Sequence, residues 1–375
     1  MKQLLLVLVL LLVAMPVSAA FPTSVTTEEI QAKYQNGQTV KVLIMPGHEP
    51  TYGGAEENGL RERDIVVTIS QKLAAQLRTD PRFEVTIARD QLAWHRDLEV
   101  YFKENWKSIE RYVKAKKKEM QRLIRKGELE DREFEVEHNT AATDVALRLY
   151  GINKWANENE YDIVIHPHLN DNVGATNHSG FAVYVPDTQF GNARASRALG
   201  ESIAAELNQF SASSTLPIEN YALVEDQDLI ALGAYNTSES AVTLIEYAYI
   251  YESKIKEAGA RDAVLSDMAY QTYRGIRDYV GAPVLGDNTL SLPYLWQVGP
   301  LTVGSSGAQV YALQAALHSL GFYPPKDQLL IGCPISGYVG ECTTQALKAF
   351  QASKGLEQTG SIGPRTKAAL QAAGF

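Results

Sequence analysis

Short apolar runs alternate with stretches of helical apolar spacing from Thr39 to about Gly281. Such alternation is typical of α/β proteins, in which strands buried in a sheet are separated by covering helices. We therefore predict an open, mixed or mainly parallel sheet flanked by helices. The predicted strands are Val40–Ile44, Phe83–Ala88, Ile163–His166, Phe181–Val185 and Val242–Ile245, and the predicted helices are Arg63–Leu77, Ala141–Asn157, Ala195–Gln209 and Asp262–Tyr279.

The stretch from about 92 to 138 interrupts this alternation because it is crowded with charged residues. Its apolar residues still recur every three, four or seven positions, which predicts a long solvated helix with one narrow apolar stripe. Two interpretations are open. The helix either packs along the edge of the domain, or regulates the protein by covering a site or receiving a partner protein. The stripe consists of Trp106, Ile109, Val113, Met120 and Leu123.

The last part of the chain contains an internal repeat. Gly337–Leu347 matches Gly360–Leu370 in its glycines, a β-branched residue, a threonine, an alanine and a leucine. Each copy predicts a glycine-framed loop that opens a helix, with a threonine hydroxyl placed to cap free amides of the first turn. Together with a helix at Val310–Leu320, the repeat predicts a small all-α domain of about three helices at 301–375.

The chain begins with features of a secretory signal peptide. Lys2 precedes the apolar run Leu4–Met15, and small residues end the segment at Ala19. The run is short for a bilayer span, so we expect a cleaved signal peptide at 1–19 and no stable membrane anchor, with a retained anchor as the alternative. In an exported chain Cys333 and Cys342 can form a disulfide, and two free thiols are the other possibility.

Length and charge limit the organisation and the partners further. The residues after the signal peptide exceed what one core usually holds, so we expect two domains, at 20–281 and 301–375, joined by a proline- and glycine-punctuated linker at 282–300. The net charge of −9 provides no broad attraction to nucleic acid, which we exclude as a partner.

Metal-binding side chains stand at the ends of the apolar runs. His48 follows the first run, His166 and His168 end the third, Glu246 ends the last, and Glu62 begins a helix. Residues just past the carboxyl ends of neighbouring strands converge on one crevice in open α/β sheets. Two imidazoles and a carboxylate are the ligands of a catalytic zinc ion, which keeps a fourth position for water. An additional unligated glutamate can take the proton of that water.

The C-terminal region resembles the three-helix peptidoglycan-binding domain of many secreted cell-wall hydrolases. The resemblance covers 301–375 and is carried by Leu320-Gly321-Phe322, Phe350-Gln351, Gly355-Leu356 and the two glycine-framed loops. It implies that peptidoglycan is the partner. A similar helical fold that binds protein instead is the alternative.

The N-terminal domain resembles, over about Val40 to Glu252, the zinc-dependent N-acetylmuramoyl-L-alanine amidases of the type 3 family. The family's motifs correspond to Pro46-Gly47-His48, to a glutamate before a helix, to His166-Pro167-His168-Leu169-Asn170, and to a late glutamate. The resemblance implies one Zn²⁺ ion, and the position of Asn170 favours His168 over His166. The implied roles are metal ligation by His48, Glu62 and His168, catalysis by Glu246, and substrate contact by Asn170.

The sequence also departs from the family's motifs. Met45 replaces an aspartate, Glu49-Pro50 replaces a glycine pair, and Tyr247-Ala248-Tyr249 replaces the usual glycine and phenylalanine. The lost aspartate is a possible partner of a ligand histidine, so ring orientation or affinity can differ without loss of a ligand.

Together, these features predict a secreted hydrolase of the periplasm or cell wall of a bacterium. The resemblance implies cleavage of the amide bond between N-acetylmuramic acid and the L-alanine of the stem peptide. Two alternatives remain: a catalytically weak or inactive amidase-like protein that binds peptidoglycan, and a zinc peptidase that acts on the stem peptide. A protein activator or an autoinhibitory contact through the 92–138 helix would add regulation.

Overall fold

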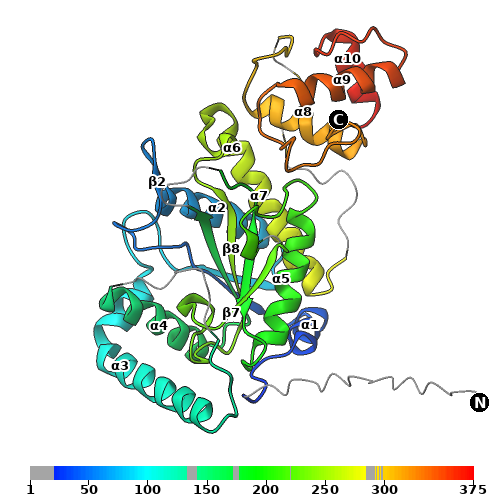
Figure 1. The fold of residues 1–375 in the computed structure, drawn as a ribbon. Coiled ribbons are helices and arrows are strands. Elements are labelled where there is room, and N and C mark those ends of the chain that lie inside the picture. The colour runs from blue at the N-terminus through cyan, green and yellow to red at the C-terminus, as the bar shows by residue number, and fades with distance from the viewer. Residues whose placement is uncertain are drawn as a thin grey trace, which may run out of the picture.

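A mixed six-stranded sheet forms the centre of the larger domain (Figure 1). The computed structural model describes residues 21–132, 142–171, 177–219, 221–283, 292, 294, 296 and 299–375. In the order β4-β1-β5-β8-β6-β7, the first four strands are mutually parallel, β6 is antiparallel to β8, and β7 is parallel to β6. The strands are β1 (Val40–Ile44), β4 (Phe83–Ile87), β5 (Ile163–Asn170), β6 (Ala182–Pro186), β7 (Leu223–Asp226) and β8 (Ala241–Tyr249).

The predicted α/β fold class is confirmed, and all five predicted strands are present. The sequence pattern missed β7, because it offers only Leu223 and Val224 as apolar residues. It also missed a short ribbon of β2 (Glu56–Glu57) and β3 (Leu60–Arg61), which contains mostly charged residues. The predicted signal peptide at 1–19 lies outside the described residues.

Helices cover both faces of the sheet, so the larger domain has three layers (Figure 1). Alternate residues of β1 point to opposite sides: Val42 and Ile44 belong to one apolar core, and Leu43 to the other. The first face is covered by α1 (Thr27–Gln35), α2 (Glu62–Leu77), α5 (Ala193–Leu207) and α7 (Ala258–Tyr279), and the second by α3 (Arg96–Arg125), α4 (Thr143–Glu158) and the 3₁₀ turn η2 (Ile230–Leu232).

The charged segment forms the long helix α3, whose apolar stripe is turned inward. Ile109 and Val113 are buried in the core that also contains Tyr150 of α4, and Met120 and Leu123 pack near Phe190. Trp106 is only partly buried, beside the core that contains Ile109 and Val113. The prediction of a long helix with one apolar stripe is therefore right. Residues 133–138 of the predicted insertion lie outside the described part of the chain.

The C-terminal domain consists of α8 (Ala308–Ser319), α9 (Glu341–Ser353) and α10 (Pro364–Ala372). The threonines of the repeat do not cap α9 and α10, contrary to our expectation, because Gly340 and Gly363 occupy the N-cap positions. Thr343 instead accepts a hydrogen bond from Gln314 Nε2 at 2.9 Å. Thr366 accepts one from Gln351 Nε2 at 3.0 Å. Each repeat is thus held together by a buried glutamine.

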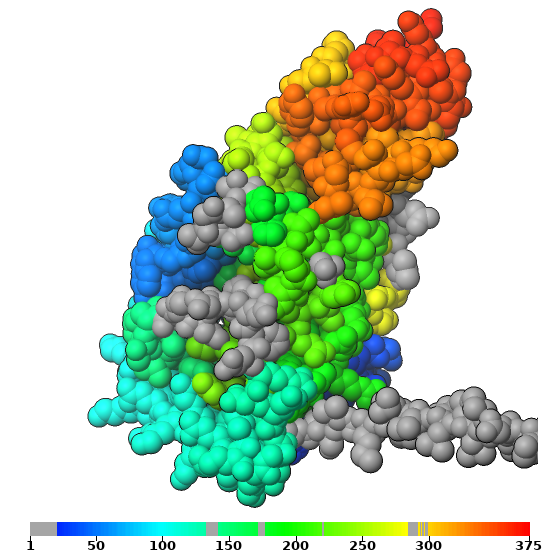
Figure 2. Space-filling view, viewed as in Figure 1, coloured from blue at the N-terminus to red at the C-terminus, as the bar shows by residue number. Residues whose placement is uncertain are grey.

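The C-terminal domain packs against α7 through polar and apolar contacts. Tyr311 on α8 donates a 2.8 Å hydrogen bond to Oδ2 of Asp267, which is buried in α7. A disulfide joins Cys333 to Cys342 in the C-terminal domain. Figure 2 shows this domain and the α3 region at opposite ends of the molecule. Across the residues that can be described, none of the helices combines the length and apolar character that crossing a membrane requires.

Candidate metal centre

His48 lies in a loop just past β1, at the carboxyl edge of the sheet. Its backbone has a φ of 69°, a left-handed conformation that is uncommon for residues other than glycine and often marks functional sites. Two glycines make room for the ring. A Cβ atom on Gly47 would lie 2.4 Å from the ring of His168, and one on Gly54 would lie 2.8 Å from that of His48. Close packing of the two histidines therefore requires glycine at both positions.

Glu62 begins α2, and its side chain is only 3 % exposed. Its Oε2 accepts a 2.9 Å hydrogen bond from the amide of Ala55, and its Oε1 accepts one of 3.0 Å from the amide of Leu169. Burial alone would raise the pKa of Glu62. The adjacent His48 and the hydrogen bond from His168 outweigh burial and hold the pKa of this carboxyl well below its usual range. Glu62 is therefore a fixed, ionised carboxylate.

His168, on β5, completes a compact cluster. Its Nδ1 lies 3.1 Å from Glu62 Oε1, and its ring is 4.8 Å from that of His48, measured between centroids. One donor atom from each of the three side chains falls within 4.8 Å of the other two. Burial lowers the pKa of His168, so the ring is neutral at pH 7 and offers a lone pair.

The donor set fits a zinc ion. Nε2 of His48 lies 2.8 Å from Glu62 Oε2, yet it is buried without an acceptable hydrogen-bond partner in the described structure. A ring nitrogen and a carboxylate oxygen at this separation can both reach one bound cation. Two imidazole nitrogens and one carboxylate are the protein ligands found in catalytic zinc sites.

His166 lies two residues before His168 on β5 and is 1 % exposed. It is not among the three clustered residues, although it lines the same cavity. Burial lowers its pKa to about 3, and its Nε2 has no hydrogen-bond partner among the described groups. His166 thus stands as a neutral ring beside the cluster.

Glu246 lies on β8, directly across from His168 in the parallel pairing of β5 and β8. It is 6 % exposed, and within the described structure its Oε2 has no hydrogen-bond partner. Burial, followed by the negative charges of Glu62 and Glu219, raises its pKa well above the usual value. This carboxyl can therefore hold a proton, as a general acid or base must do.

Asn170 ends β5 and contacts a residue that the sequence analysis missed. Its Nδ2 donates to both carboxylate oxygens of Glu219, at 2.8 and 3.0 Å. Glu219 is fully buried and also accepts hydrogen bonds from Tyr184 at 2.6 Å and from Tyr249 at 3.0 Å. Glu219 lies in the short 3₁₀ turn η1 (Pro217–Glu219), away from any strand end, so no local pattern in the sequence indicates its role.

Arg89 is the second residue that was missed. It is 1 % exposed, and its guanidinium donates to the carbonyls of Pro46 at 3.1 Å, Arg63 at 3.0 Å and Gly47. Burial lowers its pKa to about 10, which leaves it charged at neutral pH. Arg89 therefore fastens the loop of His48 to the first turn of α2. Arg89 follows β4 much as His48 follows β1. The expectation that residues just past strand ends converge on one site could therefore have identified Arg89 from the sequence.

A cavity of about 400 Å³ opens beside His48 and His168. Its wall includes Val145 and Arg148 of α4, Trp94, and Leu229 next to η2. Glu49 holds Arg148 in place, because Nε of Arg148 donates a 2.8 Å hydrogen bond to Oε1 of Glu49. The volume lies in the range typical of small-molecule sites. The cluster is thus reached through a largely apolar pocket with one fixed cation.

Two protein families match separate parts of the chain. Residues 109–278 match the N-acetylmuramoyl-L-alanine amidase family, and residues 306–370 match the putative peptidoglycan binding domain family. The first match includes His168 and Glu246 and begins after His48 and Glu62. No curated protein is similar enough in sequence to match.

Solved structures of amidases are similar to the chain at low sequence identity. The N-acetylmuramyl-L-alanine amidase of Mycobacterium smegmatis is 13 % identical with a TM-score of 0.45, and covers 64 % of this chain and 97 % of its own. The amidase of Mycobacterium abscessus is 14 % identical with a TM-score of 0.44, and the match covers 64 % of this chain and 98 % of the amidase. The N-acetylmuramoyl-L-alanine amidase of Clostridium difficile 630 is 15 % identical with a TM-score of 0.41, covering 66 % and 99 %.

Proposed function

Because the chain contains an N-acetylmuramoyl-L-alanine amidase domain followed by a peptidoglycan-binding domain, we propose that it is a secreted, zinc-dependent cell-wall hydrolase. The bond cut is the amide between the lactyl carboxyl of N-acetylmuramic acid and the L-alanine of the stem peptide. The observation that carries the proposal is the cluster of His48, Glu62 and His168, with Glu246 in register on the adjoining strand.

His48, Glu62 and His168 hold one Zn²⁺ ion in this proposal. When bound, zinc supplies a water whose pKa is brought to about 7 and polarises the amide carbonyl. The chain prepares the ligands in advance: Leu169 and Ala55 orient the Glu62 carboxylate through their amides, and Arg89 fixes the His48 loop. Hydrogen bonds of this kind orient the side chains that bind a metal ion.

Glu246 is the general base and acid. Its Oε2 is buried and has no partner in the described structure, so it is available to take a proton from the attacking water. The same atom then returns the proton to the leaving nitrogen as the C–N bond breaks. The products are a lactyl carboxylate and a stem peptide with a free amino-terminal alanine.

The cavity beside the cluster receives the part of the substrate next to the cut bond. Its apolar wall formed by Trp94, Val145 and Leu229 suits the non-polar faces of a sugar ring, and the Arg148 guanidinium suits an acceptor on the peptide. Because α4 supplies Val145 and Arg148 and α3 packs behind α4, the inserted segment shapes the pocket. Its solvated charged face is the surface that a protein activator would meet.

The C-terminal domain, which we place at 301–375 after a linker at 282–300, anchors the catalytic domain at 20–281 to its polymer. Anchoring raises the local concentration of cleavable bonds without new contacts in the catalytic site. A signal peptide at 1–19 directs the protein to the periplasm or cell wall of a bacterium.

Incubation of purified peptidoglycan with the mature protein tests the activity. We expect new amino-terminal alanine, loss of its release with a chelator, and recovery on addition of zinc. New reducing sugar ends, or cuts inside the stem peptide, would contradict the amidase assignment, and the latter would favour a zinc peptidase.

An inactive peptidoglycan-binding scaffold is the second candidate. Glu49, which replaces a glycine of the family motif, forms an ion pair with Arg148 in the lining of the pocket beside the cluster. Metal analysis separates the two functions. A hydrolase retains close to one equivalent of zinc after gentle purification, whereas a scaffold that has lost its activity retains well under half an equivalent.

A further inference from the structure

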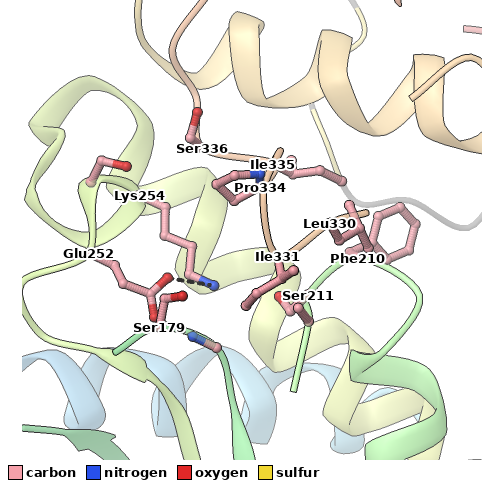
Figure 3. A pocket seen from close by; sticks show the side chains of 13 residues that line it. Ser179, Phe210, Ser211, Glu252, Lys254, Leu330, Ile331, Pro334, Ile335 and Ser336 are labelled. Carbon is pink, nitrogen blue, oxygen red and sulfur yellow. Dashed lines mark hydrogen bonds and ion pairs between the residues drawn. The ribbon is translucent and has the colours of Figure 1, made fainter. Parts of the chain in front are cut away.

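A second cleft lies where the C-terminal domain meets the catalytic domain (Figure 3). One wall comes from the catalytic domain, including Phe210 and the start of α6 (Ser253–Lys256). The other wall is the loop between α8 and α9, which contributes Leu330, Ile331 and Ile335. Its volume is about 140 Å³, far above the roughly 10–15 Å³ that one water molecule needs. The cleft can therefore hold a ligand of the size of one small amino acid.

The cleft contains a buried cation with few partners. Lys254 is 6 % exposed, and Figure 3 shows its side chain extending from α6 into the cleft toward Glu252. Nζ of Lys254 lies 3.5 Å from Oε2 of Glu252, which is longer than the 2.7–2.9 Å or so of a strong charge-assisted hydrogen bond. Within the described parts of the chain, no hydrogen bond from this ammonium is present. A buried ammonium normally has hydrogen-bond acceptors for its protons.

The neighbouring carboxylate is already engaged. Oε1 of Glu252 accepts hydrogen bonds from the amides of Gly180 and Tyr249, both at 2.9 Å. Glu252 is thus a structural acceptor that joins the start of β6 to the end of β8. Glu252 and, at longer range, the buried Asp267 offset part of the charge of Lys254, which lines the cleft.

The opposite wall is held rigidly. The disulfide fixes Cys333, and the hydroxyl of Tyr323 donates to the carbonyl of Pro334 at 2.8 Å. Oε1 of Gln314 accepts hydrogen bonds from the main-chain amides of Ser336 and Gly337, at 2.9 and 2.8 Å. A wall that is ordered before binding spares a ligand the entropy of ordering it.

The cleft continues into a second, more open groove of about 630 Å³, because Ala212, Leu330 and Ile331 line both. It also opens at the same edge of the sheet as the metal centre. Glu246 lies three residues before the end of β8, or about 10 Å along the strand, and Glu252 follows that end. An extended polymer can therefore reach both places.

We propose that this interdomain cleft binds the free carboxyl end of a short peptide with small side chains. The carboxylate pairs with the Lys254 ammonium, methyl-sized side chains contact Leu330 and Ile331, and the preceding residues run into the open groove. The hydroxyls of Ser179 and Ser336 at the margin can hydrogen-bond to peptide groups. The site needs no metal, so it stands apart from the proposed hydrolysis.

Binding of the dipeptide D-alanyl-D-alanine to the full-length, chelator-treated protein tests the site. Because this probe has no muramoyl amide bond and the protein holds no zinc, the result does not depend on amidase activity. The matched probe is the same dipeptide with a carboxyl-terminal amide. We expect titration calorimetry or chemical-shift changes to show binding of the free acid that is about tenfold or more stronger than that of the amide.

Variants then locate the binding. Lys254→Met removes the charge at similar length and should weaken binding of the free acid about tenfold or more. Lys256→Met changes an exposed lysine of the same short helix and should leave it unchanged. Ile331→Trp keeps Lys254 and fills the cleft, so it should also abolish binding. Ile331→Trp decides the matter if Lys254→Met fails to fold.

Three results would overturn the proposal. They are the absence of binding to the unaltered protein, equal binding of the acid and the amide, and unchanged binding in a folded Lys254→Met or Ile331→Trp variant.

Discussion

Glu219 and Asn170 face each other in the interior, with Nδ2 of Asn170 2.8 Å from one carboxylate oxygen of Glu219 and 3.0 Å from the other. Asn170 lies two residues after His168, and Glu219 also contributes to the raised pKa of Glu246. Glu219 therefore connects the strand of a proposed metal ligand with the surroundings of the proposed general base.

We predict that Glu219→Gln lowers kcat about 10–100-fold, as removal of supporting groups around metal sites commonly does. The glutamine side chain has only one acceptor oxygen, so it cannot accept the hydrogen bonds of Asn170, Tyr184 and Tyr249 together. We therefore expect the end of β5 to shift. Steady-state kinetics on soluble muropeptides measure the effect, and Glu201→Gln on the exposed face of α5 is the control. A change confined to KM, with kcat intact, would contradict a positioning role.

Substitution of Glu246 separates catalysis from metal binding. Glu246→Gln should retain zinc and fold but lose about two orders of magnitude or more in turnover, because the amide cannot accept the water's proton. Zinc content and turnover are measured on the same preparation. The exposed Glu239→Gln, just before β8, should behave like the unaltered protein. Near-normal turnover of Glu246→Gln would exclude Glu246 as the base.

Arg89 should influence metal affinity without touching the metal. Arg89→Lys keeps the charge but loses the planar set of donors that reaches the carbonyls of Pro46, Gly47 and Arg63. We expect zinc affinity to fall about 10–100-fold, measured by competition with a chromogenic chelator. Arg78→Lys, at an exposed arginine that also donates to a carbonyl, should leave affinity unchanged. Equal affinities in both variants would show that the His48 loop does not depend on Arg89.

The stripe of α3 should contribute mainly to stability. Ile109 is fully buried between α3 and α4, so Ile109→Ala should lower the free energy of unfolding by about 2–5 kcal/mol. Urea denaturation measures this, with the exposed Lys107→Ala as control. Turnover of soluble muropeptides should be unchanged below the unfolding transition. A faster rate in Ile109→Ala would instead favour a restraining, regulatory role for the helix.

Asp80 should make stability depend on acid pH. Its carboxylate accepts two hydrogen bonds of 2.7 Å, one from the Arg82 guanidinium and one from the Tyr34 hydroxyl. The Arg82 guanidinium is the main cause that holds the pKa of Asp80 well below its usual value. A lowered folded-state pKa means that the stabilisation is present above the unfolded-state pKa of about 3.9 and is lost as pH falls toward the folded-state pKa.

Asp80→Asn should therefore be less stable than the unaltered protein by about 1–3 kcal/mol at pH 7, and the difference should shrink below about pH 4. Denaturation curves at several pH values provide the measurement. The exposed Asp278→Asn should show no such convergence. A difference that grows on acidification would have the wrong sign for this mechanism.

The strands and the grouping of His48, Glu62 and His168 could be predicted because their signals are local. An apolar run that ends at His48 or His168 predicts a strand and also shows which side chain lies at the end of that strand. Glu219 carries no such signal, because only the folded chain brings its turn beneath β5 and β6. The same holds for Thr343, whose partner Gln314 lies one helix earlier, so a hydroxyl that a local rule assigns to capping is used in the interior.

The hydrogen bonds of Glu62 have a consequence for how the protein matures. Both carboxylate oxygens accept hydrogen bonds from main-chain amides, and Arg89 fastens the loop of His48. Small zinc modules fold only as they take up their metal. In the proposed function, hydrogen bonds and a large apolar core hold the three ligand side chains in place, so we expect the chain to fold before it binds zinc. If the proposed export and zinc dependence hold, the folded protein would gain its hydrolytic activity only in a compartment that supplies zinc.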